Sequence, residues 1–269
     1  MKHIVCFSGG KDSTALLCWA EQNLESYMTV FCDTKWEHPE TEKYIAEIIA
    51  QLVRSESFHV LTSEKYAGGM RDLVQLKGRV PSAKARFCTE NLKVEPMQRF
   101  LKTINDEFML YQGIRRDESE ARMRMQQREW SDIYDCWVER PLFYESAEQC
   151  FERIKLAGFR PNPLYLAGAG RVGCFPCALI NQRELKAYLA NPALGPMIKA
   201  NILELEALCG GSFFPPSYIP DRFCTGLDAA TGAVFPWAQD VFSYIENVDK
   251  DQLPLLPARS CMSVYNLCE

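Results

Sequence analysis

The chain has 269 residues, of which 47% are hydrophobic and 24% charged, and its formal net charge is −5. This length can bury one large core or one and a half, and the composition is typical of a globular protein. The negative charge argues against a protein that coats nucleic acid without sequence preference, because such binding needs many cationic contacts with phosphate. The sequence has no apolar run of 18 residues and no charged-then-apolar leader, so we expect a cytoplasmic protein without a membrane span.

The first half of the chain alternates short apolar runs with amphipathic segments. Buried strands are predicted over residues 3–7, 28–33, 57–61 and 107–114. One helix is expected between the first two strands and another over residues 39–53, where Pro39 stands at a first-turn position. This alternation predicts an α/β fold, a parallel sheet with helices on both faces, in a nucleotide-binding domain over residues 1–130.

The pattern changes after about residue 130, where helical periodicity dominates and the loops are rich in Pro and Gly. Helices are predicted over residues 145–157, 182–190, 196–208 and 238–247. We therefore expect residues 131–269 to form a helical, loop-rich part that carries many of the cysteines.

The segment "SGGKDS", residues 8–13, joins the first strand to the first helix. The first amides of a helix have no intrahelical partner and lie at the positive end of its dipole, so they bind anions. Gly9 and Gly10 would let these amides converge on a phosphate. Lys11 would add a positive charge, and Ser8 and Ser13 would add hydroxyl donors. The junction therefore predicts a phosphate-binding loop.

Asp12 stands in the same segment, where its negative charge would repel a phosphate. It is expected to hold a cation or to cap the helix, and Mg²⁺ beside the phosphates is the natural candidate. The alternative is a tight turn capped by Asp12 that binds no ligand.

Three segments resemble known proteins. "SGGKDS" resembles the pyrophosphatase loop of the adenine nucleotide alpha hydrolase-like superfamily, which includes GMP synthetase, tRNA thiolation enzymes and phosphoadenosine phosphosulfate (PAPS) reductases. "DTKWEHPET" (33–41) resembles the D-T-…-P-E-T segment of the PAPS reductase family, and "YQGIRRDESEARMR" (111–124) resembles its G-x-R-x-x-x-S-x-x-R segment. This resemblance implies that ATP or a sulfonucleotide contacts Asp33, Thr34, Gly113, Arg115, Arg116 and Arg122. Arginine suits phosphate and sulfate oxygens, although a solvated charged helix face is the alternative reading of this segment.

A C-x-x-C pair, Cys174 and Cys177, lies in a Gly- and Pro-containing loop. Such a pair can hold a metal ion or a cluster from two backbone positions, or act as a redox pair. The surrounding "NPLYLAGAGRVGCFPC" is similar to the run that ligates a [4Fe-4S] cluster in adenosine phosphosulfate (APS) reductases. "FCTENLKVEP" resembles the run that holds two adjacent cluster cysteines there, with Cys88 at the first position and Thr89 at the second.

The resemblance implies three of the four cluster ligands, and several cysteines could supply the fourth. The candidates are Cys224, Cys261 and Cys268. Alternatively, Cys174, Cys177, Cys261 and Cys268 form a four-thiolate site by themselves and Cys88 stays a reactive thiol. A [4Fe-4S] cluster is the first expectation and Zn²⁺ the second. The other cysteines lie in apolar patterns and are expected to be buried small residues.

The leading hypothesis is an ATP-dependent sulfur-transfer enzyme that adenylates an acceptor, releases pyrophosphate and then thiolates the acceptor. Lys11, Arg115 and Mg²⁺ would offset charge in the transition state, and Cys88 would handle the sulfur. The expected partners are an adenine nucleotide, a sulfur donor such as a cysteine desulfurase, and an unknown acceptor, with nucleic acid among the candidates.

Two other functions stay open at this point. One is a reductase of PAPS or APS that releases sulfite and uses Cys268 as its nucleophile, although the chain ends in "YNLCE" where those reductases carry E-C-G-L-H. The other is a non-catalytic nucleotide-binding protein with structural zinc.

Overall fold

A computed structural model of the chain describes residues 1–249 and 253. Its centre is a six-stranded sheet with the order β3-β2-β1-β4-β6-β5. The strands are β1 (Lys2–Phe7), β2 (Tyr27–Cys32), β3 (Ser55–Leu61), β4 (Phe108–Tyr111), β5 (Arg128–Ser131) and β6 (Cys136–Glu139). All neighbours are parallel except β5, which pairs antiparallel with β6. The predicted α/β fold with a parallel sheet is confirmed.

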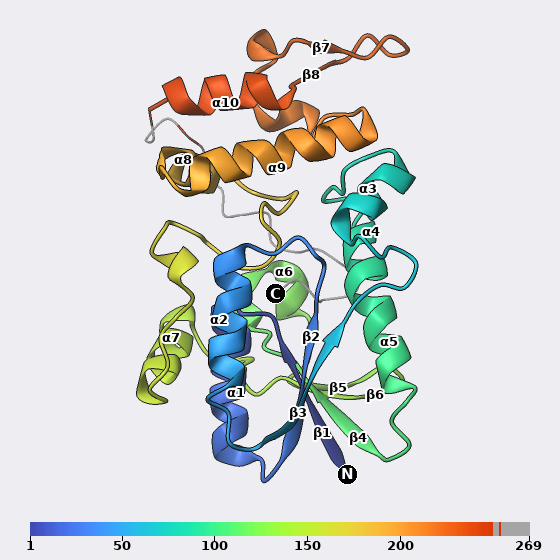
Figure 1. The fold of residues 1–269 in the computed structure, drawn as a ribbon, viewed down its shortest axis with the longest axis vertical. Helices are drawn as coiled ribbons and strands as arrows, with labels where there is room; N and C mark the ends of the chain where they lie inside the picture. The colour runs from blue at the N-terminus through green and yellow to red at the C-terminus, as the bar shows by residue number, and fades with distance from the viewer. Residues whose placement is uncertain (250–252, 254–269) are drawn as a thin grey trace.

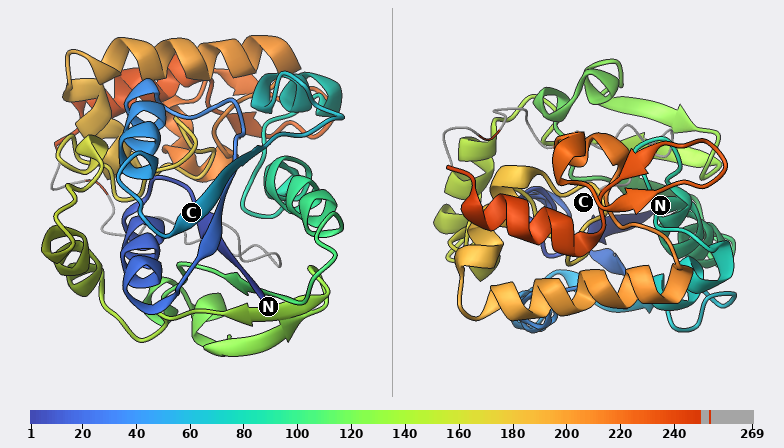
Figure 2. Two further views of the ribbon diagram at one scale, coloured as in Figure 1. Left: turned by 60° about the horizontal axis from the view of Figure 1, so that its bottom comes forward. Right: turned by 90° about the horizontal axis from the view of Figure 1, so that it is seen from above.

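Helices cover both faces of this sheet, as Figure 2 shows in its left view. One face packs against α1 (Lys11–Asn23), α2 (Pro39–Ile49) and α7 (Ala147–Leu156). The other face packs against α5 (Glu95–Leu101). Successive residues of a strand point to opposite faces, and in β1 Val5 joins the first core while Ile4 joins the second.

A helical layer lies beyond the end of the sheet that carries the strand carboxyl ends (Figure 1). It consists of α8 (Gln182–Ala190), α9 (Leu194–Cys209) and α10 (Ala238–Asn247), and it shares a core with α3 (Met70–Lys77). The bounds of α8 and α10 match the predicted ranges. A short hairpin of β7 (Gly226–Leu227) and β8 (Val234–Phe235) precedes α10.

Short helical segments complete the described part of the chain. They are α4 (Phe87–Thr89), the π-helical η1 (Glu90–Val94), α6 (Glu120–Met123), and the 3₁₀ segments η2 (Arg116–Glu118), η3 (Pro163–Tyr165), η4 (Pro216–Tyr218) and η5 (Asp221–Phe223). Among the described residues, no helix combines the length and the apolar character that crossing a membrane requires.

The sheet continues past residue 130, which we expected to be the domain boundary. The hairpin of β5 and β6 extends it to Glu139, and α7 then packs on the face that α1 covers. The sequence pattern missed this hairpin because its outer face is half exposed. Trp130 and Trp137 are 48% and 45% exposed, so the hairpin carries no continuous apolar run.

Candidate functional site

The loop between β1 and α1 turns at Gly9, whose φ of +76° lies in the left-handed region. A Cβ atom there would stand 3.0 Å from Thr41 Cγ2 and 3.1 Å from Ile45 Cγ1, so the site has room for glycine only. Gly10 follows as the N-cap of α1 and offers no side chain to the first-turn amides. The predicted strand–glycine–helix junction is therefore formed at the carboxyl end of β1, beside the position where the strand order reverses between β1 and β4.

Asp12 forms a buried ion cluster with two cations. Its Oδ1 lies 2.7 Å from Arg115 Nε and its Oδ2 lies 2.9 Å from Lys11 Nζ. Burial alone would lower the pKa of Arg115, but the charge and hydrogen bond of Asp12 outweigh it and raise that pKa. Asp12 was expected to hold Mg²⁺ or to cap the helix, and these roles stay predictions; in the structure both of its oxygens contact protein cations.

Gly113 explains how Arg115 reaches this cluster. It follows β4, and a Cβ atom there would stand 2.8 Å from the backbone oxygen of Asp12 and 3.0 Å from the backbone nitrogen of Ser13. Only glycine allows the loop after β4 to lie directly on the first turn of α1. The loop then carries Arg115 to the carboxylate of Asp12.

Two other arginines of the same segment lie elsewhere. Arg116 is exposed, and its guanidinium stands 5.5 Å from the centre of the Tyr144 ring. Arg122 is buried in an ion pair with Glu118. Of the three arginines that the resemblance assigned to the nucleotide, Arg115 contacts the phosphate loop through Asp12. The nucleotide-binding role of the other two stays a prediction.

The segment after β2 connects the sheet to the C-x-x-C loop. Asp33 Oδ1 accepts a hydrogen bond from the backbone nitrogen of Lys35 at 2.7 Å, which closes a turn. The buried hydroxyl of Thr34 donates to Glu37 Oε1 at 2.7 Å and lies 3.6 Å from Cys174 Sγ. Burial raises the pKa of Glu37 to about 7, although the Thr34 hydrogen bond and the charge of Lys93 oppose this shift.

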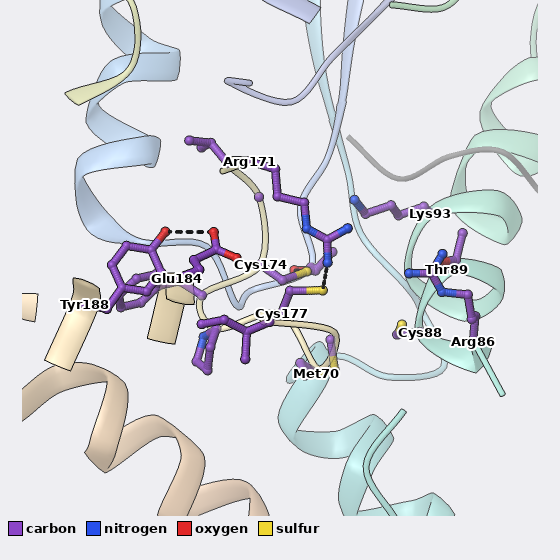
Figure 3. A pocket seen from close by; sticks show the side chains of 16 residues that line it. Met70, Arg86, Cys88, Thr89, Lys93, Arg171, Cys174, Cys177, Glu184 and Tyr188 are labelled. Carbon is purple, nitrogen blue, oxygen red and sulfur yellow. Dashed lines mark hydrogen bonds between the residues drawn. The ribbon is translucent and has the colours of Figure 1, made fainter. Parts of the chain in front are cut away.

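Three cysteines from two distant parts of the sequence line one pocket (Figure 3). Cys88 comes from α4, and Cys174 and Cys177 come from the loop that precedes α8. Three cationic side chains line the same pocket: Arg86, Lys93 and Arg171. The pocket therefore combines nucleophilic sulfur with groups that bind anions.

Arg171 contacts one of the three thiols directly, since its Nη2 donates to Cys177 Sγ at 2.7 Å (Figure 3). None of these three cations was among the site residues predicted from the sequence. A signal was present, because Arg86 lies two residues before Cys88, Lys93 five after it, and Arg171 three before Cys174. Their side chains converge only because the fold brings the two segments together.

Burial controls the thiols of this pocket. It raises the pKa of Cys174 to about 12, and the charge of Lys93 opposes the shift without cancelling it. Burial raises the pKa of Cys88 in the same way. Burial therefore favours the protonated form of both thiols in this pocket.

The expected metal site does not form from the described residues. Within residues 1–249 and 253, no three side chains of His, Cys, Asp or Glu lie close enough together to hold one metal ion. Cys224 follows η5, where its Sγ contacts the Pro220 backbone oxygen at 3.8 Å, and it does not line the cysteine pocket. Cys261 and Cys268 lie outside the described residues.

A second hollow joins the cysteine pocket to the phosphate loop. It is lined by Ser8 of that loop, by Glu37, and by Lys93 and Gly173, which also line the cysteine pocket. The hollow beside Ser8 of the phosphate loop and the pocket of the three thiols are therefore neighbours, with Lys93 and Gly173 lining both.

A parallel α/β sheet with a glycine turn at the point of strand reversal defines a nucleotide-binding class of protein. The sequence model of the phosphoadenosine phosphosulfate reductase domain matches residues 2–180, and the chain belongs to this family. The same fold occurs in the crystal structure of PAPS reductase from Candida auris in complex with phosphate. That match has a TM-score of 0.53 and 17% identity, and covers 66% of this chain and 83% of the other.

Relatives of unknown function extend the similarity. An uncharacterized protein of Escherichia phage 186 is 29% identical, over 99% of this chain and 96% of the phage protein. Two uncharacterized proteins of Methanocaldococcus jannaschii are each 26% identical, over 68% and 70% of this chain. The matched parts span 37% and 44% of those archaeal proteins.

Proposed function

We propose that the protein is an ATP-dependent sulfur-transfer enzyme of the PAPS reductase family. The observation that carries this proposal is the shared pocket of Cys88, Cys174 and Cys177 with three cations, which adjoins the hollow beside Ser8 of the phosphate loop. Activation of an acceptor by a nucleotide and attack by sulfur would need the phosphate loop and the thiol pocket side by side.

The first half-reaction activates the acceptor. An acceptor oxygen attacks the α-phosphorus of ATP, the bond to the β-phosphate oxygen breaks, and pyrophosphate leaves toward the phosphate loop. Lys11 and Arg115 supply positive charge where the leaving group gains negative charge. Asp12 holds both cations in place, and its negative charge offsets part of their positive charge until the nucleotide binds.

The second half-reaction transfers sulfur. A persulfide donor delivers its outer sulfur to Cys88, and this sulfur attacks the activated acceptor atom as AMP leaves. The acceptor is then joined to Cys88 by a disulfide, which the thiolate of Cys177 attacks. The products are the acceptor thiol and a Cys88–Cys177 disulfide, which an external dithiol reduces. The guanidinium of Arg171, whose Nη2 donates to Cys177 Sγ, lies beside the sulfur that makes this attack.

A reductase is the second candidate, and the same pocket favours it. The side chains of Arg86, Lys93 and Arg171 present the charge that a sulfate group carried by a sulfonucleotide would bind. In that reaction a thiolate attacks the sulfate sulfur and the nucleotide leaves, and a second thiol releases sulfite.

The two candidates are separated by their nucleotide and their product. Purified protein is incubated with Mg²⁺, α-labelled ATP, a persulfide donor and deproteinised cell extract as the source of acceptor, or with labelled PAPS or APS plus dithiol. Pyrophosphate and AMP formed only with ATP support sulfur transfer, and sulfite formed from a sulfonucleotide supports the reductase. Lys11→Ala is expected to lower the supported activity about 100-fold, a typical effect of losing one charge-stabilising group. If no nucleotide is turned over, both candidates fail.

A further inference from the structure

Tyr165 makes a long-range contact with the phosphate loop. Its hydroxyl oxygen accepts a hydrogen bond from the backbone nitrogen of Lys11 at 2.8 Å, across 154 residues of sequence. Lys11 is the first residue of α1, so its N–H is one of the amides that have no partner within the helix. Tyr165 therefore satisfies an amide that an incoming phosphate oxygen would bind.

The contact belongs to a larger cover, which we define as residues 162–172. At its start, Asn162 Nδ2 donates to the backbone oxygen of Gly9 at 3.2 Å. At its end, the backbone oxygen of Val172 lies 3.5 Å from the position that a Cβ atom of Gly10 would take. The cover segment thus crosses the whole turn of the phosphate loop, and Ser8, Lys11 and Ser13 are buried.

The cover segment is anchored from within and is open on its outer side. Leu164 is buried, and the Tyr165 ring packs edge-on against Phe151 with 5.3 Å between the ring centres. The next residue, Leu166, is 95% exposed. That side chain is open to solvent, whereas Leu164, Ala169 and Val172 of the segment are buried in the core shared with α8, α9 and α10. The outer turn around Tyr165 and Leu166 can therefore shift while the rest of the segment stays packed.

The cover segment continues directly into the cysteine pocket. Arg171, near its end, contacts Cys177, and Gly173, just after it, lines both hollows. Two residues beyond the cover, Cys174 pairs with Glu37 in an isolated antiparallel bridge. A shift of the segment at the phosphate loop would therefore move Arg171 relative to the thiols.

We propose that residues 162–172 are a nucleotide-responsive cover that Tyr165 latches to the phosphate loop. A phosphate oxygen displaces the Tyr165 hydroxyl from the Lys11 amide, the turn around Tyr165 shifts, and the shift passes along the cover to Arg171 and opens the thiol pocket. The exchange favours phosphate because a hydrogen bond to an anion is about twice as strong as one between neutral groups. This inference rests on the proposed nucleotide binding. It adds an order of events to the proposed reaction: the nucleotide binds first, and the sulfur chemistry follows.

Tyr165→Phe tests the latch, with inorganic pyrophosphate as the probe in titration calorimetry. The variant keeps the ring on Phe151 and removes only the competing hydroxyl. Its pyrophosphate affinity is expected to rise about two- to tenfold, the range that corresponds to one neutral hydrogen bond. Tyr218→Phe is the matched control, because it loses a hydroxyl bond to the Ile180 backbone oxygen away from the phosphate loop, and its affinity should equal that of the wild type.

A second measurement uses the wild-type protein and does not depend on any variant. Cys174 and Cys177 are alkylated with iodoacetamide, and their rates are followed by peptide mass spectrometry with and without pyrophosphate. We expect pyrophosphate to raise both rates several-fold and to leave the buried Cys18 unchanged.

Different failures have different meanings. Equal or weaker pyrophosphate binding by Tyr165→Phe would overturn the latch, because the hydroxyl would then not compete with phosphate. Alkylation rates that do not respond to bound pyrophosphate would overturn the coupling between the two hollows. In both cases pyrophosphate still binds, and the proposed function stands. If neither pyrophosphate nor ATP binds to any variant, the proposed function and the cover fail together.

Discussion

Arg115 Nε lies 2.7 Å from Asp12 Oδ1, and both side chains are almost completely buried. The pair joins the loop after β4 to the first turn of α1, so it fixes the position of that loop beside the phosphate loop. Lys11 shares the same carboxylate. The cluster is therefore structural, because it holds two elements together, and it also sets the charge that a nucleotide would meet.

Removing the carboxylate should destabilise the fold strongly. Asp12→Ala removes the buried carboxylate that two buried cations share, and we expect a loss of about 3–5 kcal/mol in the free energy of unfolding. Asp117→Ala is the control, because Asp117 also pairs with Arg115 but its side chain is 52% exposed. That control should cost less than about 1 kcal/mol. Urea denaturation measures both, and equal losses would show that the burial of Asp12 does not matter.

The close approach of Gly113 to α1 gives a second stability prediction. In Gly113→Ala the new methyl group meets the backbone of Asp12 and Ser13, which cannot move independently of the helix. We expect a loss of about 1–3 kcal/mol. Gly211→Ala is the comparison, because its Cβ atom would meet only Cys209 Sγ, at 3.9 Å. The hypothesis fails if thermal or urea unfolding does not separate the two variants.

Glu37 should make stability depend on pH. Its pKa is raised from 4.5 to about 7 in the folded protein, mainly by burial, so the folded state binds this proton more tightly than the unfolded chain does. The resulting stabilisation is complete below about pH 4.5 and is lost as the pH rises through 7.

Glu37→Gln keeps the neutral form at every pH, so it should unfold at higher urea concentration than the wild type at pH 8 and lose this advantage at pH 4.5. Glu64→Gln, at a side chain that is 82% exposed, should show no such difference. A constant offset between Glu37→Gln and the wild type across this range would contradict the assignment.

The sequence predicted the parts of the fold that rest on periodicity. The strands β1 to β4 and the helices α8 and α10 are continuous apolar or amphipathic patterns, and their burial follows the pattern directly. The glycine turn was predictable for a similar reason, because Gly9 adopts a backbone conformation that few other residues tolerate. The hydrophobic pattern and the backbone preferences of nearby residues decide these features.

Contacts between distant segments could not be predicted in this way. Arg115 was expected to read an anion, yet the structure pairs it with Asp12, 103 residues earlier. The contact of Tyr165 with Lys11 and the meeting of Arg171 with Cys88 in one pocket depend equally on how the segments pack. A sequence motif gives residue types and spacing, whereas the partner of each charge depends on the fold.

The proposed sulfur-transfer reaction predicts that its two halves can be separated at Cys88. Cys88→Ser should still release pyrophosphate from ATP and form the adenylated acceptor, because the phosphate loop and Arg115 are unchanged. Thiolation should fall at least about 100-fold, since serine cannot carry a persulfide. Cys209→Ser is the matched control, as Cys209 lies at the end of α9 and does not line the pocket. Label from the nucleotide and sulfur from the donor are followed in one reaction. Loss of both activities in Cys88→Ser would mean that Cys88 holds the site together, and unchanged thiolation would transfer the sulfur-handling role to Cys174 or Cys177.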